Sequence, residues 1–427
     1  MIEQMPKYDS YKESGVEWLG EIPEHWSLIP NKRIFNLKKK LVGKRSSEYD
    51  LLSLTLKGII KRDMDNPEGK FPAEFDTYQE VSSGDFVFCL FDVEETPRTV
   101  GLSKFDGMIT GAYTVFNPSE QYSREFLYYF YLNLDTDKKL KPLYKGLRNT
   151  ISKEAFFSFK TFVPPINEQV KIAKYLDRTT VQIDEAIAIK QKQIELLKER
   201  KQIIIQQAVT QGLKSNSALV ETDLIWAPKI ASHWSLLPNR LFLKIRRVPV
   251  GSAYKNYQML SLTKKGVLIR DLSKGAGKQS DFLERMQEVR KGDFIFCLFD
   301  VEETPRTVGL SKHLGMISAD YTIFECNDKY TGRFLEYYYK SMDDQKLLKP
   351  LYKGLRNRIP KPRFLRTNCP MPPKDELIEI VMYLDTLEEK TTRSIEIILS
   401  QIKKLKEYRT TLINSAVTGK IKVTELA

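Results

Sequence analysis

The sequence is poor in cysteine, and none of its four cysteines forms a CxxC pair, so neither a disulfide framework nor a zinc site is expected. Cys89 and Cys297 lie in FVFCLF and FIFCLF, a pattern typical of small buried side chains. No apolar run reaches the roughly 18 residues of a membrane span. The start, MIEQMPKYDSYKESG, lacks the charged-then-apolar order of a signal peptide. We therefore expect a cytoplasmic protein.

Catalytic motifs are also missing. His25, His233 and His313 have neither the spacing of metal ligands nor a paired nucleophile. There is no Walker A loop, no dinucleotide-binding glycine loop and no Asp/Asn-Pro-Pro-Tyr/Phe motif of adenine methyltransferases, because the Pro-Pro pair at 164–165 stands between valine and isoleucine. We expect no catalysis, no metal and no cofactor in this chain.

Positive charge is in excess, with 68 lysines and arginines against 55 acidic residues and a net charge of +13. A basic surface attracts polyanions and releases their counterions, so nucleic acid is the favoured partner class. Anionic membrane fits less well, because neither terminus carries a basic amphipathic helix. The 427 residues exceed what one hydrophobic core usually organises, which predicts at least two domains.

A long internal repeat organises the chain. HWSLIPN starts at His25 and HWSLLPN at His233, and FCLFDVEETPRTVGLSK occurs identically at Phe88 and Phe296. LKPLYKGLRN also occurs twice, and all three pairs are offset by 208 residues, which indicates a nearly gapless duplication. Solenoid repeats run only about 20 to 50 residues, so this period indicates duplicated domains.

Each copy divides into a globular head and a helical part. Short β-rich runs such as DFVFCLF alternate with turn residues, and one helix, REFLYYFYLNL, is expected among them, so each head is a mixed α/β domain. Prolines end each head, and a Pro-free helical stretch follows. The expected boundaries are 1–165 for the first head, 166–212 for its helix, 213–232 for a linker, 233–373 for the second head and 374–420 for the last helix.

Apolar residues recur in both helices at alternating spacings of three and four, which predicts a coiled-coil seam. An antiparallel pair would give an α+β protein with two tandem heads related by a pseudo-twofold axis and separated by the helices. Parallel pairing, or pairing with another chain, is the alternative. The seam positions are Leu176, Ile183, Ile187, Ile194, Leu197, Ile204, Leu384, Ile395, Ile398, Ile402, Leu405 and Leu412.

Some of these stretches resemble a known family. YKESGVEWLGEIPEHW, FVPPINEQVKIAKYLD and INSAVTGKIKV are similar to the specificity (S) subunit of type I restriction-modification enzymes, and the order of heads and helices matches over essentially the whole chain. The resemblance implies two target recognition domains that each read half of a bipartite site in double-stranded DNA. It also implies docking of two adenine methyltransferase (M) subunits, which bind S-adenosylmethionine, and of restriction (R) subunits. The second copy departs at 375–377, where DEL replaces NEQ.

Three repeated loops carry side chains suited to DNA. Arginine can form bidentate bonds to guanine, asparagine to adenine, and a carboxylate can accept from cytosine. Lysine suits phosphate. The loops are DVEETPRTVGLSK, KGLRN and the pair LTLKGIIKRD and LTKKGVLIRD. The candidate DNA contacts are Lys57, Arg62, Asp92, Arg98, Thr99, Lys104, Lys145, Arg148, Asn149, Lys265, Arg270, Asp300, Arg306, Thr307, Lys312, Lys353, Arg356, Asn357 and Arg358.

Other interpretations of these loops remain. The DVEE carboxylates could bind magnesium in a nuclease site, or they could form a solvated turn with an internal ion pair. A standalone tandem DNA-binding regulator would also explain the charge and the duplication. Matching loops predict matching half-sites and an interrupted palindrome, or one close to it. Thr150 and Arg358, Leu56 and Lys264, Ala112 and Asp320, and Phe105 and His313 are paired differences through which the half-sites could differ.

Overall fold

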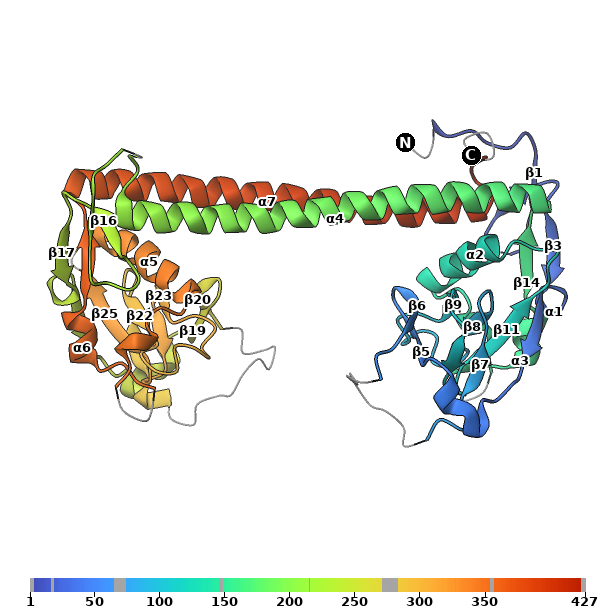
Figure 1. Ribbon diagram of the computed structural model, residues 1–427, viewed down its shortest axis with the longest axis horizontal. Helices are drawn as coiled ribbons and strands as arrows, with labels where there is room; N and C mark the ends of the chain where they lie inside the picture. Colours follow the sequence, from blue (N-terminus) through green and yellow to red (C-terminus); the bar gives the residue numbers. More distant parts are fainter. Residues whose placement is uncertain are drawn as a thin grey trace. The chain divides into compact units, whose positions relative to one another are not determined.

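The computed structural model describes residues 4–16, 19–64, 74–145, 149–214, 216–270, 283–326, 328–353 and 357–423 (Figure 1). It forms two compact units, unit 1 with Met1–Lys190 and Ser400–Ala427, and unit 2 with Gln191–Leu399. The long helices α4 (Ile166–Gln211) and α7 (Lys374–Val417) each begin in one unit and end in the other. Each unit therefore contains one head, the start of one long helix and the end of the other.

The head of unit 1 is built on a four-stranded antiparallel sheet in the order β4-β11-β8-β9. Side chains alternate across a sheet, and here Phe86 and Phe88 join the main core while Val87 joins a smaller cluster. Helix α2 covers the aromatic face, where the Tyr131 ring lies 5.1 Å from that of Phe88. The strands and the helix are β4 (Phe35–Lys38), β8 (Phe86–Phe88), β9 (Val100–Leu102), β11 (Thr114–Pro118) and α2 (Arg124–Thr136).

Paired short strands surround this sheet. A hairpin of β5 and β6 packs on β9 so closely that a Cβ at Gly101 would lie 2.7 Å from side-chain atoms of Leu54 and Ile59. The other pairs are β1 with β2, β3 with β14, β7 with β10, and β12 with β13. The bounds are β1 (Tyr11–Glu13), β2 (Glu21–Pro23), β3 (Ser27–Pro30), α1 (Asn31–Ile34), β5 (Leu52–Thr55), β6 (Gly58–Lys61), β7 (Gln79–Val81), β10 (Gly107–Ile109), β12 (Tyr144–Lys145), β13 (Thr150–Ile151), α3 (Lys153–Ser158) and β14 (Lys160–Val163).

The head of unit 2 repeats this plan, with the sheet order β18-β25-β22-β23. Phe294 and Phe296 again join the main core, and Ile295 joins the smaller cluster. The bounds are β15 (Leu219–Glu221), β16 (Lys229–Ala231), β17 (Ser235–Pro238), β18 (Leu243–Arg246), β19 (Leu260–Thr263), β20 (Gly266–Ile269), β21 (Gln287–Val289), β22 (Phe294–Phe296), β23 (Val308–Leu310), β24 (Gly315–Ile317), β25 (Thr322–Cys326), α5 (Lys329–Asp344), α6 (Lys361–Arg366) and β26 (Asn368–Met371).

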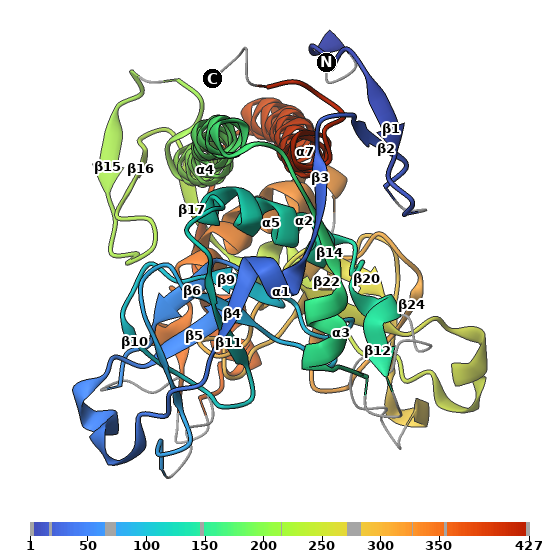
Figure 2. The same cartoon turned by 90° about the vertical axis from the view of Figure 1, so that its right-hand side faces the viewer.

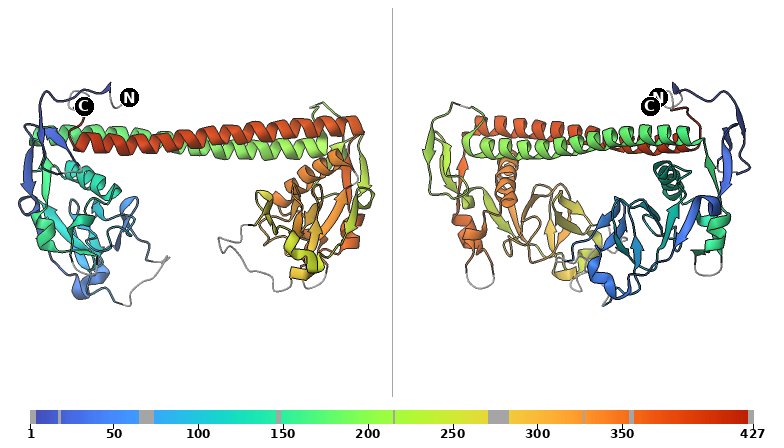
Figure 3. Two further views of the ribbon diagram at one scale, coloured as in Figure 1. Left: turned by 180° about the vertical axis from the view of Figure 1, so that it is seen from behind. Right: turned by 45° about the vertical axis from the view of Figure 1, so that its right-hand side comes forward.

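The long helices pair with opposite directions in both units (Figure 3). In unit 1, Leu412 of α7 shares a core with Leu176 near the start of α4. In unit 2, Ala208 near the end of α4 shares a core with Leu384 near the start of α7. The predicted fold class, including the antiparallel coiled coil, is confirmed. None of the helices in the described part of the chain is both long and apolar enough to cross a membrane.

The seam positions expected from the sequence line this pairing. Leu176, Ile183, Ile187, Ile194, Leu384, Ile402 and Leu412 are buried, and Leu197, Ile204, Ile395, Ile398 and Leu405 are half-buried. Polar residues interrupt the seam of unit 1: the Lys190 ammonium donates to the Gln401 side chain at 2.7 Å, and the Arg409 guanidinium lies 3.4 Å from the Asp184 carboxylate. Polar pairs at seam positions favour one register over others.

Each head is bonded to the long helix that follows it. In unit 1, α2 lies beneath the long helices (Figure 2), and its Tyr129 hydroxyl donates to the Asp177 carboxylate of α4 at 2.7 Å. In unit 2, Tyr337 donates to Asp385 at 2.7 Å, and the Arg333 guanidinium adds a second bond to that carboxylate. Arg333 also donates to Glu388 of α7, which makes the connection in unit 2 more extensively charged.

Candidate nucleic-acid interface

Two of the repeated loops are joined by one hydrogen bond in each unit. The Asp92 N–H donates to the Asn149 carbonyl at 3.0 Å, and the Asp300 N–H donates to the Asn357 carbonyl at 3.0 Å. All four residues have a left-handed backbone, with φ between 43° and 47°. Aspartate and asparagine tolerate this conformation better than other residues with a Cβ atom. The DVEE loop is therefore joined in each head to the asparagine that ends the KGLRN stretch, Asn149 or Asn357.

A second bond fixes the register of this junction. The Ile151 N–H donates to the Leu90 carbonyl at 2.7 Å, and the Ile359 N–H donates to the Leu298 carbonyl at the same distance. Exposed side chains at the junction are those of Asn149, Thr150, Lys353, Asn357 and Arg358, while Asp92 and Asp300 are half-buried. The candidates Arg148 and Arg356 lie outside the described residues, as does the side chain of Lys145.

Part of the DVEE charge is neutralised within each head. The Lys141 ammonium lies 2.7 Å from the Glu94 carboxylate, and Lys349 lies 2.7 Å from Glu302. The hydrogen bond from Lys349 to Glu302 raises the pKa of that lysine. Within the described residues, no group of three or more histidine, cysteine, aspartate or glutamate side chains is placed to hold a metal ion. The Lys141–Glu94 and Lys349–Glu302 pairs match the solvated turn with an internal ion pair.

Arg98 and Thr99, with Arg306 and Thr307, point inward. Thr99 is 1% exposed and Thr307 is 0% exposed, so neither side chain can reach a base in this structure. The Arg98 guanidinium lies 3.2 Å from a carboxylate at the end of α2, and Arg306 makes the matching contact at 3.1 Å. Direct base contact by the two threonines stays a prediction, and their burial in this structure disfavours it. Such contact is also disfavoured for the two arginines, because they are paired inside the head.

The hairpin tips present lysine to solvent. Lys57 lies in the turn between β5 and β6, where its N–H donates to the Thr55 hydroxyl at 3.1 Å, and Lys265 has the same place and the same bond in unit 2. Both lysines are exposed, as are Lys104 and Lys312. Arg62 and Arg270 are half-buried beyond the hairpins. The four lysines are therefore open to solvent, and the two arginines are less accessible.

The heads differ around these shared features. Leu56 and Lys264 occupy the same exposed place at the hairpin tips, and Thr150 and Arg358 occupy the same exposed place beside the junction. In unit 1, the Lys61 ammonium lies 5.6 Å from the centre of the Phe105 ring. Unit 2 has isoleucine and histidine at the matching positions, 269 and 313. Both heads thus share a backbone frame and vary the exposed side chains.

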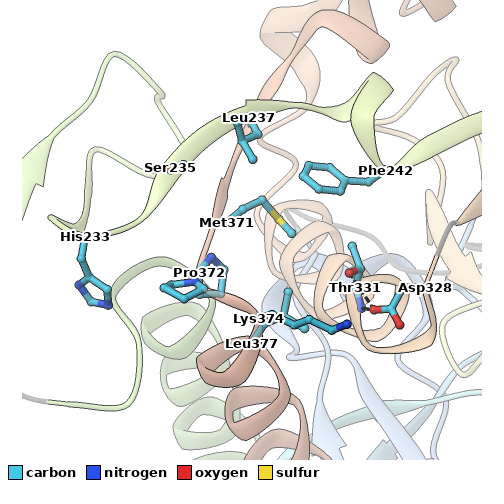
Figure 4. Close-up of a pocket in the computed structure, with 11 residues that line it drawn as sticks. His233, Ser235, Leu237, Phe242, Asp328, Thr331, Met371, Pro372, Lys374 and Leu377 are labelled. Atoms are coloured by element: carbon cyan, nitrogen blue, oxygen red, sulfur yellow. Dashed lines mark hydrogen bonds between the residues drawn. The ribbon is translucent and has the colours of Figure 1, made fainter.

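A hollow of roughly 390 Å³ in unit 2 lies away from these loops (Figure 4). Leu377 lines it together with Asp328 and Thr331, which are joined by a hydrogen bond. At the position matching Leu377, unit 1 has Gln169, which donates to the Pro164 carbonyl at 2.8 Å and accepts from a backbone N–H at 2.9 Å. The departure from NEQ to DEL therefore replaces a buried polar side chain with an apolar one at the start of α7.

Sequence reasoning missed the two aspartates that hold Arg98 and Arg306, which are Asp135 and Asp343. Both are 2% exposed and lie in the last turn of α2 and α5. A signal was present, because an Asp-x-x-Lys pattern recurs at the common offset in LDTDKK and MDDQKL. The pattern carries no DNA-binding chemistry of its own, and its role is visible only through the loop that it contacts.

Comparisons with known proteins agree with this architecture. Residues 99–199 match the family described as Type I restriction modification DNA specificity domain. The HsdS subunit from Thermoanaerobacter tengcongensis is 13% identical, with 96% of this chain and 100% of that chain covered and a TM-score of 0.56. A chain from a structure described as “Structural basis underlying complex assembly and conformational transition of the type I R-M system” is also 13% identical, with 93% and 98% covered and a TM-score of 0.62. No curated protein matches the sequence. The resemblance predicted from the sequence is confirmed.

Proposed function

We propose that this protein, which carries a type I restriction-modification DNA specificity domain, is the specificity subunit of such a system and reads a bipartite DNA site. Each head reads one half-site in double-stranded DNA. Because the two heads share their loops, the half-sites are similar in sequence and lie on opposite strands, as an interrupted palindrome or close to one.

The junction of the DVEE loop with Asn149 or Asn357 is the observation that carries this proposal. Both heads hold the same left-handed aspartate and asparagine in the same hydrogen bond, at 3.0 Å in each case. A fixed loop junction presents its side chains to a base edge without a further cost of ordering. Asn149 and Asn357 are suited to adenine, and the exposed lysines nearby are suited to phosphate.

The long helices have two roles in this proposal. They set the distance between the half-sites, because α4 and α7 each run from one unit into the other. They also dock two methyltransferase subunits, with restriction subunits joining for cleavage. The chain itself supplies no catalysis and no cofactor. S-adenosylmethionine binds to the methyltransferase, which extracts the target adenine from the duplex. The complex acts in the cytoplasm.

The experiment that tests this proposal is a genome-wide map of N6-methyladenine in the native host. The map is recorded by single-molecule sequencing in the wild type, in a strain lacking this gene and in the same strain with the gene restored. We expect one bipartite motif to disappear and return, with two similar halves on opposite strands.

Two other outcomes would count against parts of the proposal. A lost motif with unrelated halves would overturn the matching of half-sites while leaving the specificity role. No lost motif, with the partner methyltransferase shown to be expressed, would overturn the specificity role and favour a standalone DNA-binding regulator.

A further inference from the structure

A buried carboxylate lies behind the repeated loop of unit 1. The Asp135 side chain is 1% exposed and accepts four hydrogen bonds. The donors are Arg98 Nη1 at 3.2 Å, the Thr99 N–H at 3.2 Å, the Thr99 hydroxyl at 2.6 Å and Lys138 Nζ at 2.7 Å. Lys138 Nζ also donates to the Thr96 carbonyl at 2.7 Å. The end of the loop is therefore attached to one carboxylate through two consecutive residues, Arg98 and Thr99.

Unit 2 contains the same arrangement except for one bond, because the buried Thr307 hydroxyl has no hydrogen-bond partner among the described residues. Asp343 accepts from Arg306 Nη1 at 3.1 Å, from the Thr307 N–H at 3.0 Å and from Lys346 Nζ at 2.9 Å. Lys346 Nζ donates to the Thr304 carbonyl at 2.7 Å. The other end of each loop is held by a backbone hydrogen bond, from the Asp92 N–H to the Asn149 carbonyl or from the Asp300 N–H to the Asn357 carbonyl. Both ends of residues 92–99 and 300–307 are therefore fixed.

One feature of this arrangement is unfavourable for the helices themselves. Asp135 and Asp343 lie in the last turn of a helix, where the negative end of the helix dipole disfavours a carboxylate. Lys138 and Lys346, with φ of 52° and 54°, form the left-handed ends of these helices, where the next N–H donates back to the Leu134 carbonyl at 2.8 Å and to the Met342 carbonyl at 3.0 Å. The two carboxylates recur at matching positions and accept hydrogen bonds from the repeated loop. The helix dipole does not account for them, whereas fixing the loop does.

In unit 1, the arginine bound to Asp135 also contacts the neighbouring hairpin. Arg98 Nη2 lies 3.4 Å from the carbonyl oxygen of Leu56, at the tip that carries Lys57. In unit 2, Asp344 accepts from Arg306 Nη1 at 2.8 Å, and the position matching Asp344 in unit 1 is a threonine. One carboxylate thus positions the repeated loop in both heads, and through its arginine it reaches the hairpin tip in unit 1.

We infer that Asp135 and Asp343 are positioning residues for base recognition, each fixing the loop shape on which its own half-site specificity depends. This inference rests on the proposed function. Neither carboxylate touches DNA. Each acts through the residues that it holds, so its removal changes which bases are preferred more than it changes the attraction to phosphate.

The test uses the full-length chain coexpressed with its methyltransferase and a duplex selected by the wild-type complex from a random library. Affinities are measured for that duplex, for single-base variants in each half and for a scrambled duplex. The variants are Asp135→Asn, Asp343→Asn and the control Asp137→Asn, which removes an exposed carboxylate that pairs only with Lys139 among the described ion pairs.

We expect Asp135→Asn to lower discrimination in one half-site about tenfold, equal to roughly 1.4 kcal/mol, and Asp343→Asn to do the same in the other half. Affinity for the scrambled duplex and all values for Asp137→Asn stay within twofold of wild type. Unchanged discrimination in both variants would overturn the inference, as would an equal loss on every duplex, which a merely structural role would give.

Failure of the proposed function has a different signature. A wild-type complex that selects no sequence from the library contradicts sequence reading itself. If Asp135→Asn does not fold, Lys138→Gln decides the matter, because it removes the ammonium bond to Thr96 and leaves three of the bonds to Asp135. Half-site relaxation in Lys138→Gln supports the inference, and wild-type discrimination overturns it.

Discussion

Exchanging Thr150 and Arg358 tests whether the exposed differences between the heads set differences between the half-sites. Both side chains are exposed, and their backbones form matching bridges, to Phe91 in unit 1 and to Phe299 in unit 2. The exchange therefore moves an arginine between two similar frames. We expect the free energy of unfolding to change by less than about 0.5 kcal/mol for each single substitution, as is usual for surface positions.

The effect on recognition is expected to be larger. A good bidentate arginine contact to a base is worth about 1 to 3 kcal/mol of discrimination, or roughly 5- to 150-fold in affinity. Thr150→Arg should add a base preference in one half-site, and Arg358→Thr should remove the matching preference in the other. Competition binding with single-base duplex variants measures both, and the methylation motif gives an independent readout in cells. An unchanged motif and unchanged affinities would refute the assignment of these two positions as readers.

Two further changes test the packing and the ionisation of the cores. Leu412→Ala should lower the free energy of unfolding by about 2 to 5 kcal/mol, because Leu412 is 0% exposed in the core of unit 1. Leu399→Ala, at a half-exposed position of the same helix, should change the free energy of unfolding by less than about 0.5 kcal/mol. Urea unfolding measures both, and equal effects would contradict the seam. Burial raises the pKa of Cys369 from an ordinary 9.0 to about 12, so the unfolded chain releases this proton at lower pH than the folded chain. The contribution to stability is therefore present below about pH 9 and lost as pH rises toward 12, and Cys369→Ala should reduce the slope of unfolding free energy against pH in that range.

The long helices and the duplication were predictable because they depend on local patterns. The stretch after the prolines at 164–165 has no proline or glycine before Gly212. The spacing of its apolar residues predicts a coiled-coil seam without any knowledge of the partner helix. The order of strands was not predictable. In the sheet, β4 pairs with β11, and their residues Phe35 and Pro118 meet across an intervening stretch that contains several other strands. Such pairings depend on packing between distant segments and leave no periodic signal along the chain.

The residue types of the candidate interface were predictable from the sequence, but which of their side chains point to solvent was less predictable. Asn149 and Arg358 were expected from residue type, and the structure places them at an exposed junction, although their contact with DNA stays a prediction. Thr99 was a candidate base contact because threonine can meet either kind of base edge, yet it is 1% exposed. It is buried because its partner, Asp135, comes from a helix further along the chain. Side-chain direction in an irregular loop depends on such partners, and a pattern read along one stretch cannot supply them.

The first head in this sequence has a core that is completed by a helix far along the chain, α7. The core of unit 1 includes Leu412, Ile413, Ala416 and Val417 of α7 together with Leu176 near the start of α4. During translation, the apolar side chains that meet α7 have no partner until the end of α7 has left the ribosome. Contacts between such distant residues form late, and the exposed surface is open to aggregation in the interval. Unit 2 receives both of its helix segments earlier. In nascent chains that still lack the C-terminal end of α7, the second head should therefore resist protease digestion, whereas the first head should remain susceptible.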